Sequence, residues 1–123
     1  LRLGQAPLEE CASVHAGGGV ALVEDLGITL NVCLTSNCKL VYGDLEAHPI
    51  RELWKSRVPL TINTDDPETL GVSLCSELKL AADHLLMSQK DLIAVQGNAI
   101  TAAFCSERKK ARLFELLGNF VGP

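Results

Sequence analysis

The sequence lacks an apolar run long enough to cross a bilayer, which argues against a membrane protein. It begins Leu1-Arg2-Leu3 and has no initiator methionine, basic segment or continuous apolar stretch from which a secretory signal could be read. It also has no basic stripe, because the formal net charge is -4 and the one tight basic cluster, at 108–112, is typical of the solvated face of a helix. We therefore expect neither a membrane nor a nucleic acid as a partner, and the missing methionine indicates that Leu1 is not a natural N-terminus.

The five cysteines give no disulfide framework, since they are odd in number and scattered, at positions 11, 33, 38, 75 and 105. A reducing compartment is the simplest assignment, so we expect a cytoplasmic protein. Cys33 and Cys38 lie closest together, but no second Cys/His pair supplies the remaining ligands of a closed tetrahedral zinc site. A structural zinc is therefore not expected.

Two apolar segments predict buried parallel strands that each end in polar residues. Residues 27–37 begin with a turn residue, continue as an apolar run and end in a polar stretch suited to a loop. Residues 58–63 repeat this pattern, with Pro59 near the strand start, where its missing N–H does least harm. Between them, residues 49–57 show the spacing of a helix with one apolar face. The order strand, helix, strand is the repeating unit of parallel α/β folds, so the chain is predicted to be α/β.

The remainder of the chain has helical patterns. An apolar stripe runs through residues 74–85, and Ser88 with Asp91 resembles a capping box at the start of a second helix. A last stripe ends at Leu117, and the following Gly118 is predicted to stop that helix. We expect these helices to cover the outside of the sheet.

Adjacent carboxylates follow the second predicted strand, in the segment Thr64-Asp65-Asp66-Pro67-Glu68. In one interpretation Asp65 or Asp66 caps a helix that starts at Pro67. In the other, acids at the carboxyl end of a parallel strand occupy the place where barrel enzymes gather catalytic groups. One carboxylate then binds a cation while its neighbour faces the substrate. The residues by themselves leave both interpretations open.

Several ordered motifs resemble the last two strands and the terminal helices of the adenosine deaminase family. They are VCLTSN at 32–37, HP at 48–49, VPLTINTDDP at 58–67 with Gly71, Leu74 and Glu77, and then Ser88, Asp91-Leu92, Asn98-Ala99, Ala103-Phe104 and Arg108-Lys109-Lys110. The likeness covers about three quarters of the chain, and ordered motifs at family-like separations are much more specific than any single motif.

The resemblance implies a partial TIM (β/α)8 barrel, of which this chain would supply the last strands plus the C-terminal helices. It also implies zinc-dependent hydrolytic deamination of adenosine or a related amino-purine nucleoside or base. Asp65 matches the family's metal ligand, and Asp66 matches the residue that hydrogen-bonds the purine ring. The chemistry agrees, since zinc can lower the pKa of water to about 7 and a fixed acid can select one nitrogen heterocycle. Ser36 and Asn37 match the loop after the penultimate strand, where a supporting role is expected.

The glycine stretch around residue 18 departs from the family pattern. Val14-His15-Ala16-Gly17 resembles a His-Ala-Gly-Glu motif whose His is a metal ligand and whose Glu shuttles protons, so His15 is a second candidate ligand and Gly18 stands in place of the Glu. Alternatively, Gly17-Gly18-Gly19-Val20 followed by Glu24-Asp25 matches the next strand's Gly-His-Gly motif, and Gly18 replaces the catalytic His. An internal deletion near 17–26 that fuses the two motifs explains both matches.

The family's His-x-His pair from the first barrel strand is not found in the sequence, and a whole barrel needs about 250 residues whereas this chain has 123. We therefore interpret residues 1–123 as the C-terminal part of one barrel domain. Two hypotheses follow. The chain is a portion of a zinc deaminase that is active when the missing barrel half is present, or it is a catalytically inactive remnant that acts as a binding or regulatory fragment. For the isolated chain we expect self-association through its uncovered strands.

Overall fold

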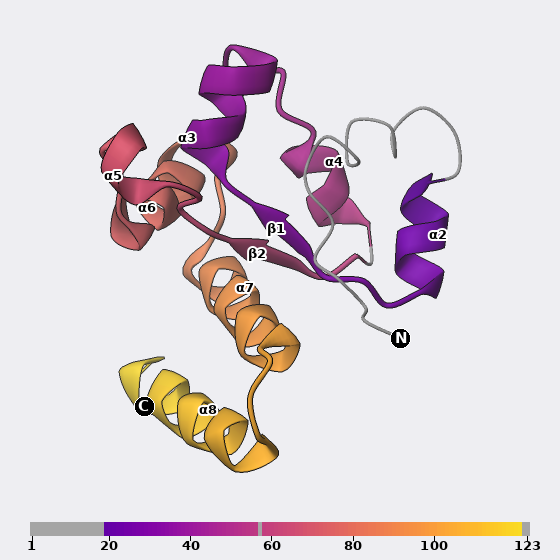
Figure 1. Cartoon of the computed structure of the whole chain (residues 1–123), viewed down its shortest axis with the longest axis vertical. Coiled ribbons are helices and arrows are strands. Elements are labelled where there is room, and N and C mark those ends of the chain that lie inside the picture. Colours follow the sequence, from indigo (N-terminus) through magenta and orange to yellow (C-terminus); the bar gives the residue numbers. More distant parts are fainter. Residues whose placement is uncertain (1–18, 57, 122–123) are drawn as a thin grey trace.

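Two short parallel strands lie at the centre of the structure, a computed structural model that describes residues 19–56 and 58–121 (Figure 1). Strand β1 (Leu30–Val32) pairs with β2 (Leu60–Ile62), with Leu30 opposite Leu60 and Val32 opposite Ile62. The helices are α2 (Gly19–Asp25), α3 (Leu34–Asn37), the π-helix η1 (Cys38–Tyr42), α4 (Ile50–Lys55), α5 (Pro67–Leu70), α6 (Leu74–Leu85), α7 (Gln89–Ala102) and α8 (Glu107–Val121). Because α4 connects two parallel strands, the predicted order strand, helix, strand is confirmed and the fold is α/β.

The first strand is shorter than predicted, and a helix follows it instead of the predicted loop. Strand β1 stops at Val32, and α3 begins after one residue and runs on into η1. Two acceptors satisfy N–H groups that a helix start leaves without intrahelical partners. Asn37 Oδ1 accepts from the Cys33 N–H at 3.3 Å, and the carboxylate of Glu77 on α6 accepts from the Thr35 N–H at 3.0 Å. The prediction of a loop was wrong because one of these acceptors is 42 residues away and leaves no local pattern.

One face of the two-stranded sheet is buried. The residues that share this face by alternation are Leu30, Val32, Leu60 and Ile62. Each is 5% exposed or less. They belong to a single core with buried side chains from α4, α6, α7 and the adjoining segments, which include Leu34, Ile50, Leu53, Val58, Ala81, Met87 and Val95. Burial of side chains of this size stabilises the fold by about 1.5–3 kcal/mol each, so this core is the main support of the strand ends.

Helix α7 holds the outer edge of β2 through Asn98. The Pro59 carbonyl accepts from the Leu30 N–H at 2.9 Å, so the next carbonyl along β2, that of Leu60, points away from β1. Asn98 Nδ2 donates to this Leu60 carbonyl at 2.9 Å. An edge carbonyl that no described strand pairs with is therefore satisfied by a side chain, which also fixes α7 against β2.

Helices α7 and α8 form a pair at the end of the chain, with α8 on the side of α7 away from the strands (Figure 1). The predicted capping box is confirmed, since the Ser88 N–H donates to Asp91 Oδ2 at 2.8 Å and the Asp91 N–H donates to Ser88 Oγ at 3.3 Å. The prediction that Gly118 stops the last helix was wrong, because α8 continues to Val121. Gly118 is not among the glycines with positive φ, which is the conformation that a glycine stop requires.

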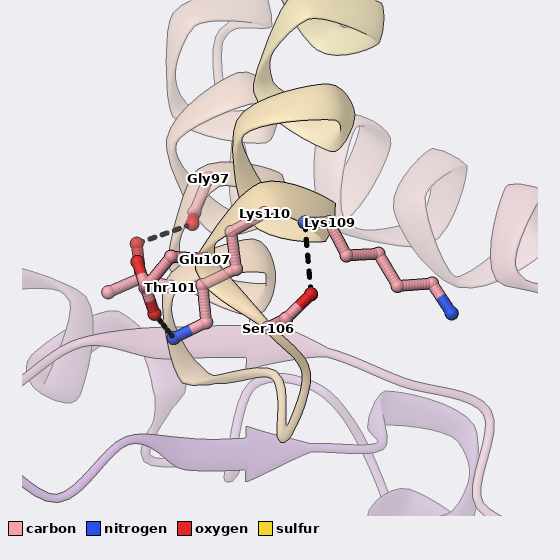
Figure 2. Close-up of polar contacts among 6 residues, drawn as sticks. All are labelled: Gly97, Thr101, Ser106, Glu107, Lys109 and Lys110. Atoms are coloured by element: carbon pink, nitrogen blue, oxygen red, sulfur yellow. Dashed lines mark hydrogen bonds and ion pairs between the residues drawn. The ribbon is translucent and has the colours of Figure 1, made fainter.

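Figure 2 shows the turn that joins these two helices. Ser106 Oγ accepts from the Lys109 N–H at 3.4 Å, and Lys110 Nζ lies 3.2 Å from a carboxylate oxygen of Glu107. In α7, Thr101 Oγ1 donates to the Gly97 carbonyl at 3.0 Å. The ion pair is solvent-exposed on its acidic side and contributes little stability.

Within residues 19–56 and 58–121, no helix is both long and apolar enough to span a bilayer.

Candidate functional site

Polar side chains meet where the two strands end. Because β1 and β2 are parallel, the segments that follow them, residues 33–36 and 63–66, emerge at the same edge of the sheet. Ser36 is 3% exposed, and its hydroxyl donates to Asp65 Oδ2 at 2.8 Å. The structure thus brings together two residues that the sequence placed in separate motifs. The Ser36 hydroxyl holds one oxygen of the Asp65 carboxylate.

Asp65 has a backbone conformation that is uncommon for a residue with a side chain. Its φ is 61°, in the left-handed region, which costs an L-residue roughly 1–2 kcal/mol, although Asp tolerates it better than most. Such a conformation persists only where the surrounding contacts determine it, here the hydrogen bond from Ser36 and the helix α5 that begins two residues later. Strained residues of this kind cluster at functional sites, and of the two non-glycine residues with positive φ in the described part of the chain, Asp65 and Leu86, Asp65 is the one whose side chain can bind a cation.

Asp66 caps helix α5. Its Oδ1 accepts from the Thr69 N–H at 3.2 Å, and Pro67 occupies the first turn, as the capping interpretation predicts. Hydrogen bonding to Thr69 lowers the pKa of Asp66, so this exposed carboxylate is ionised at neutral pH. The cap uses Oδ1, and the side chain remains open to solvent.

A buried histidine, His48, joins α3 to α4. His48 Nδ1 accepts from the Ile50 N–H at 3.0 Å, so the ring proton is on Nε2, which donates to Asn37 Oδ1 at 3.1 Å. The ring is 3% exposed and packs against Tyr42, with 4.9 Å between the ring centroids. Burial lowers the pKa of His48 to about 4, so the imidazole is neutral. Sequence reasoning found His48 only as part of a motif, since a lone His carries no signal of burial.

Glu77 is the second residue whose place the sequence did not predict. It is 1% exposed, and its two carboxylate oxygens accept from the N–H and the hydroxyl of Thr35. The available signal was its position on α6, one turn before the fully buried Ala81, on the face that packs inward. An acid on an apolar helix face is usually paired, and here the partner is a strand-end residue.

Cys33 is close enough to the carboxylates of Asp65 and Glu77 to feel their charge. Burial, followed by the negative charges of Asp65 and Glu77, raises the pKa of the Cys33 thiol to about 11. The thiol is therefore protonated at neutral pH, which disfavours Cys33 as a nucleophile.

The candidate metal ligands are only partly within the described residues. His15, like Gly18, lies outside them. Across residues 19–56 and 58–121, no three His, Cys, Asp or Glu side chains are grouped closely enough to hold a metal ion. Asp65 fits the requirement for one ligand, because it is exposed, is a hard oxygen donor and has one oxygen oriented by Ser36.

Comparison with known proteins identifies the family. The family model for adenosine deaminase matches residues 19–119. The chain belongs to the adenosine deaminase family. It is 36% identical over 125 residues to an adenine deaminase of Mesorhizobium japonicum and 31% identical over 122 residues to an adenosine deaminase of Yersinia enterocolitica. These matches cover 94% and 91% of the chain but 39% and 37% of the two relatives. The chain therefore spans about two fifths of the length of these family members.

Solved structures agree on the fold. The chain superposes on an adenine deaminase from Arthrobacter aurescens with a TM-score of 0.83 and 23% identity, over 90% of this chain and 34% of that one. The apo N6-methyl-AMP deaminase of Arabidopsis thaliana gives a TM-score of 0.76 and 24% identity, over 95% of this chain and 39% of that one. The amidohydrolase of Burkholderia ambifaria with bound zinc gives 0.68 and 22%, over 89% and 32%.

Proposed function

We propose that this chain carries part of the active site of a zinc-dependent hydrolase that deaminates adenine, adenosine or a related amino-purine with water, to give ammonia and the corresponding 6-oxopurine, which is the inosine-type product for a nucleoside. The observation that carries the proposal is the placement of the Asp65 carboxylate at the carboxyl end of β2, where Ser36 holds one of its oxygens. The relatives named adenine deaminase and adenosine deaminase support the reaction and the amino-purine class of substrate.

Zinc, when bound, supplies the Lewis acidity that makes hydroxide available from water near neutral pH. Asp65 is proposed to ligate the metal through the oxygen that Ser36 does not hold. Asp66 is proposed to accept a hydrogen bond from a protonated ring nitrogen of the purine, because its lowered pKa keeps it ionised and its side chain is exposed. A base without that N–H would leave the acceptor unpaired, which is the physical source of selectivity.

The proposed setting of this site is a TIM (β/α)8 barrel, in which β1 and β2 are the last two strands. A catalytic zinc generally takes about three protein ligands, so Asp65 needs further ligands from the barrel half that this chain does not match. The zinc-bound Burkholderia neighbour supports this setting. The missing barrel half is therefore the principal partner that we propose.

His15 is proposed as a second ligand, and residues 17–26 as the place of an internal deletion. The alternative is a catalytically inactive remnant with a binding or regulatory role, which is favoured by Gly18 in place of a catalytic side chain. Turnover distinguishes the two, because a remnant supplied with zinc and the other barrel strands does not deaminate adenine or adenosine.

Substitution of Asp65 tests the proposal. In a protein that carries the complete barrel, Asp65→Ala is expected to remove bound zinc and deaminase activity together, as measured by elemental analysis and by the absorbance change of adenosine. Glu68→Ala is the matched control, since Glu68 is an exposed acid three residues away and should leave both unchanged. Wild-type zinc content in Asp65→Ala would remove Asp65 from the metal site.

A further inference from the structure

Glu77 is a buried carboxylate with an unusual partner. Of the acids in the described part of the chain, it is the one that is buried, at 1% exposure. Both of its oxygens are directed to Thr35, one to the N–H at 3.0 Å and the other to the hydroxyl. Removal of a carboxylate from water is unfavourable unless hydrogen bonds satisfy it, so these two donors determine where Glu77 lies. The contact ties α6 to the end of β1.

The contact also supplies a cap that α3 does not provide for itself. The N-cap residue of α3 is Cys33, and its side chain makes no capping hydrogen bond. Thr35 is the second residue of α3, and its N–H is one of those that a helix start leaves without an intrahelical acceptor. The negative charge of Glu77 at the N-terminus of α3 also interacts favourably with the helix dipole. Glu77 therefore performs the capping role from a different helix.

The next residue along α3 is Ser36, which holds Asp65. We propose that Glu77 is a positioning residue for Asp65, acting through Thr35 and Ser36 so that the carboxylate is oriented before a metal arrives. The path is short: the Glu77 carboxylate fixes the Thr35 peptide, the adjacent Ser36 hydroxyl is thereby aimed, and that hydroxyl lies 2.8 Å from Asp65 Oδ2. Its role for a metal rests on the function proposed above.

A metal-free measurement on the 123-residue chain tests the positioning. The 13Cγ resonance of Asp65 reports the environment of its carboxylate, and Ser36→Ala defines the displacement that loss of the hydroxyl hydrogen bond causes. Glu77→Gln is expected to move the Asp65 resonance in the same direction, because an amide cannot accept from both Thr35 donors. The double variant is expected to move it no further than Ser36→Ala alone, since both changes act on one path.

Two further variants keep the test decisive. Thr35→Val removes only the hydroxyl donor and is expected to produce a smaller displacement of the same sign, and it serves if Glu77→Gln does not fold. Ser88→Ala removes the capping box of α7, a helix that does not carry Glu77, so it should leave the Asp65 resonance in place. Wild-type Asp65 resonances in folded Glu77→Gln and Thr35→Val would overturn the proposal.

A zinc titration separates this inference from the proposed function. With zinc chloride as the probe and a protein that carries the complete barrel, the Asp65 resonance of the wild type is expected to shift saturably, and Glu77→Gln should raise the dissociation constant about tenfold, the effect expected when a residue that orients a metal ligand is changed. Asp65→Asn should abolish the shift. If the wild type shows no zinc-dependent shift, the metal role of Asp65 is contradicted, while the metal-free comparison still decides whether Glu77 orients it. Equal zinc affinity in wild type and Glu77→Gln contradicts the positioning role alone.

Discussion

Acidification should destabilise this fold through His48. The folded chain holds the pKa of His48 at about 4, against an ordinary value of 6.5, because the ring is buried. Above pH 6.5 the imidazole is neutral in both the folded and the unfolded chain, so its contribution to stability is fully present. As the pH falls toward 4, the unfolded chain binds a proton that the folded chain rejects, and stability is lost at up to about 1.4 kcal/mol per pH unit.

Over the whole window the loss approaches about 3 kcal/mol, a large fraction of the stability of a small domain. The assay is urea unfolding followed by circular dichroism at several pH values from 7.5 to about 4.5, at a protein concentration where light scattering shows monomer. His48→Gln is the matched variant, since a glutamine amide can donate to Asn37 and accept from Ile50 but does not titrate. The wild type should lose stability more steeply than His48→Gln below pH 6.5. Parallel pH profiles would refute the reasoning, because the carboxylates titrate alike in both proteins.

Three other outcomes are expected. In a complete barrel, Asp66→Asn should retain zinc but lower kcat/KM, because Asp66 is proposed to bind the purine. Loss of zinc equal to that in Asp65→Ala would contradict the assignment of metal binding to Asp65 and purine binding to Asp66. Asn98→Ala should lower the free energy of unfolding by about 1–3 kcal/mol, since the Leu60 carbonyl loses its donor. Lys90→Ala should change it little, because Lys90 is exposed, and equal effects of the two variants in urea unfolding would contradict the edge contact. The 123-residue chain alone should not turn over adenosine and should self-associate, because Phe104 is 84% exposed and β1 and β2 have outer edges that no described strand pairs with. Sustained turnover by a protein that is monomeric in light scattering would show that the missing strands are dispensable.

The sequence alone predicted the elements that depend on local pattern. Apolar runs bounded by polar residues identified both strands, and the proline and acid spacing after the second strand offered a helix cap at Asp65 or Asp66, of which the structure has Asp66. The capping box of α7 was equally readable, because Ser88 and Asp91 satisfy each other three residues apart. The motif order from residue 32 to 110 was enough to identify the family, which the match over residues 19–119 confirms.

The tertiary structure decided what depends on partners far apart in the chain. Residues 34–42 are helical and do not form a loop, since Glu77 caps them from α6. Helix α8 likewise continues past Gly118. A single sequence does not show that His48 is buried and neutral or that Asn98 reaches the edge of β2, because these properties arise when distant segments exclude water around a polar group. For the candidate site, the sequence named Asp65, and only the fold placed Ser36 against it and Glu77 behind Thr35. Local capping and alternation are encoded within a few residues, whereas the orientation of a carboxylate is set by contacts that form only when the chain has folded.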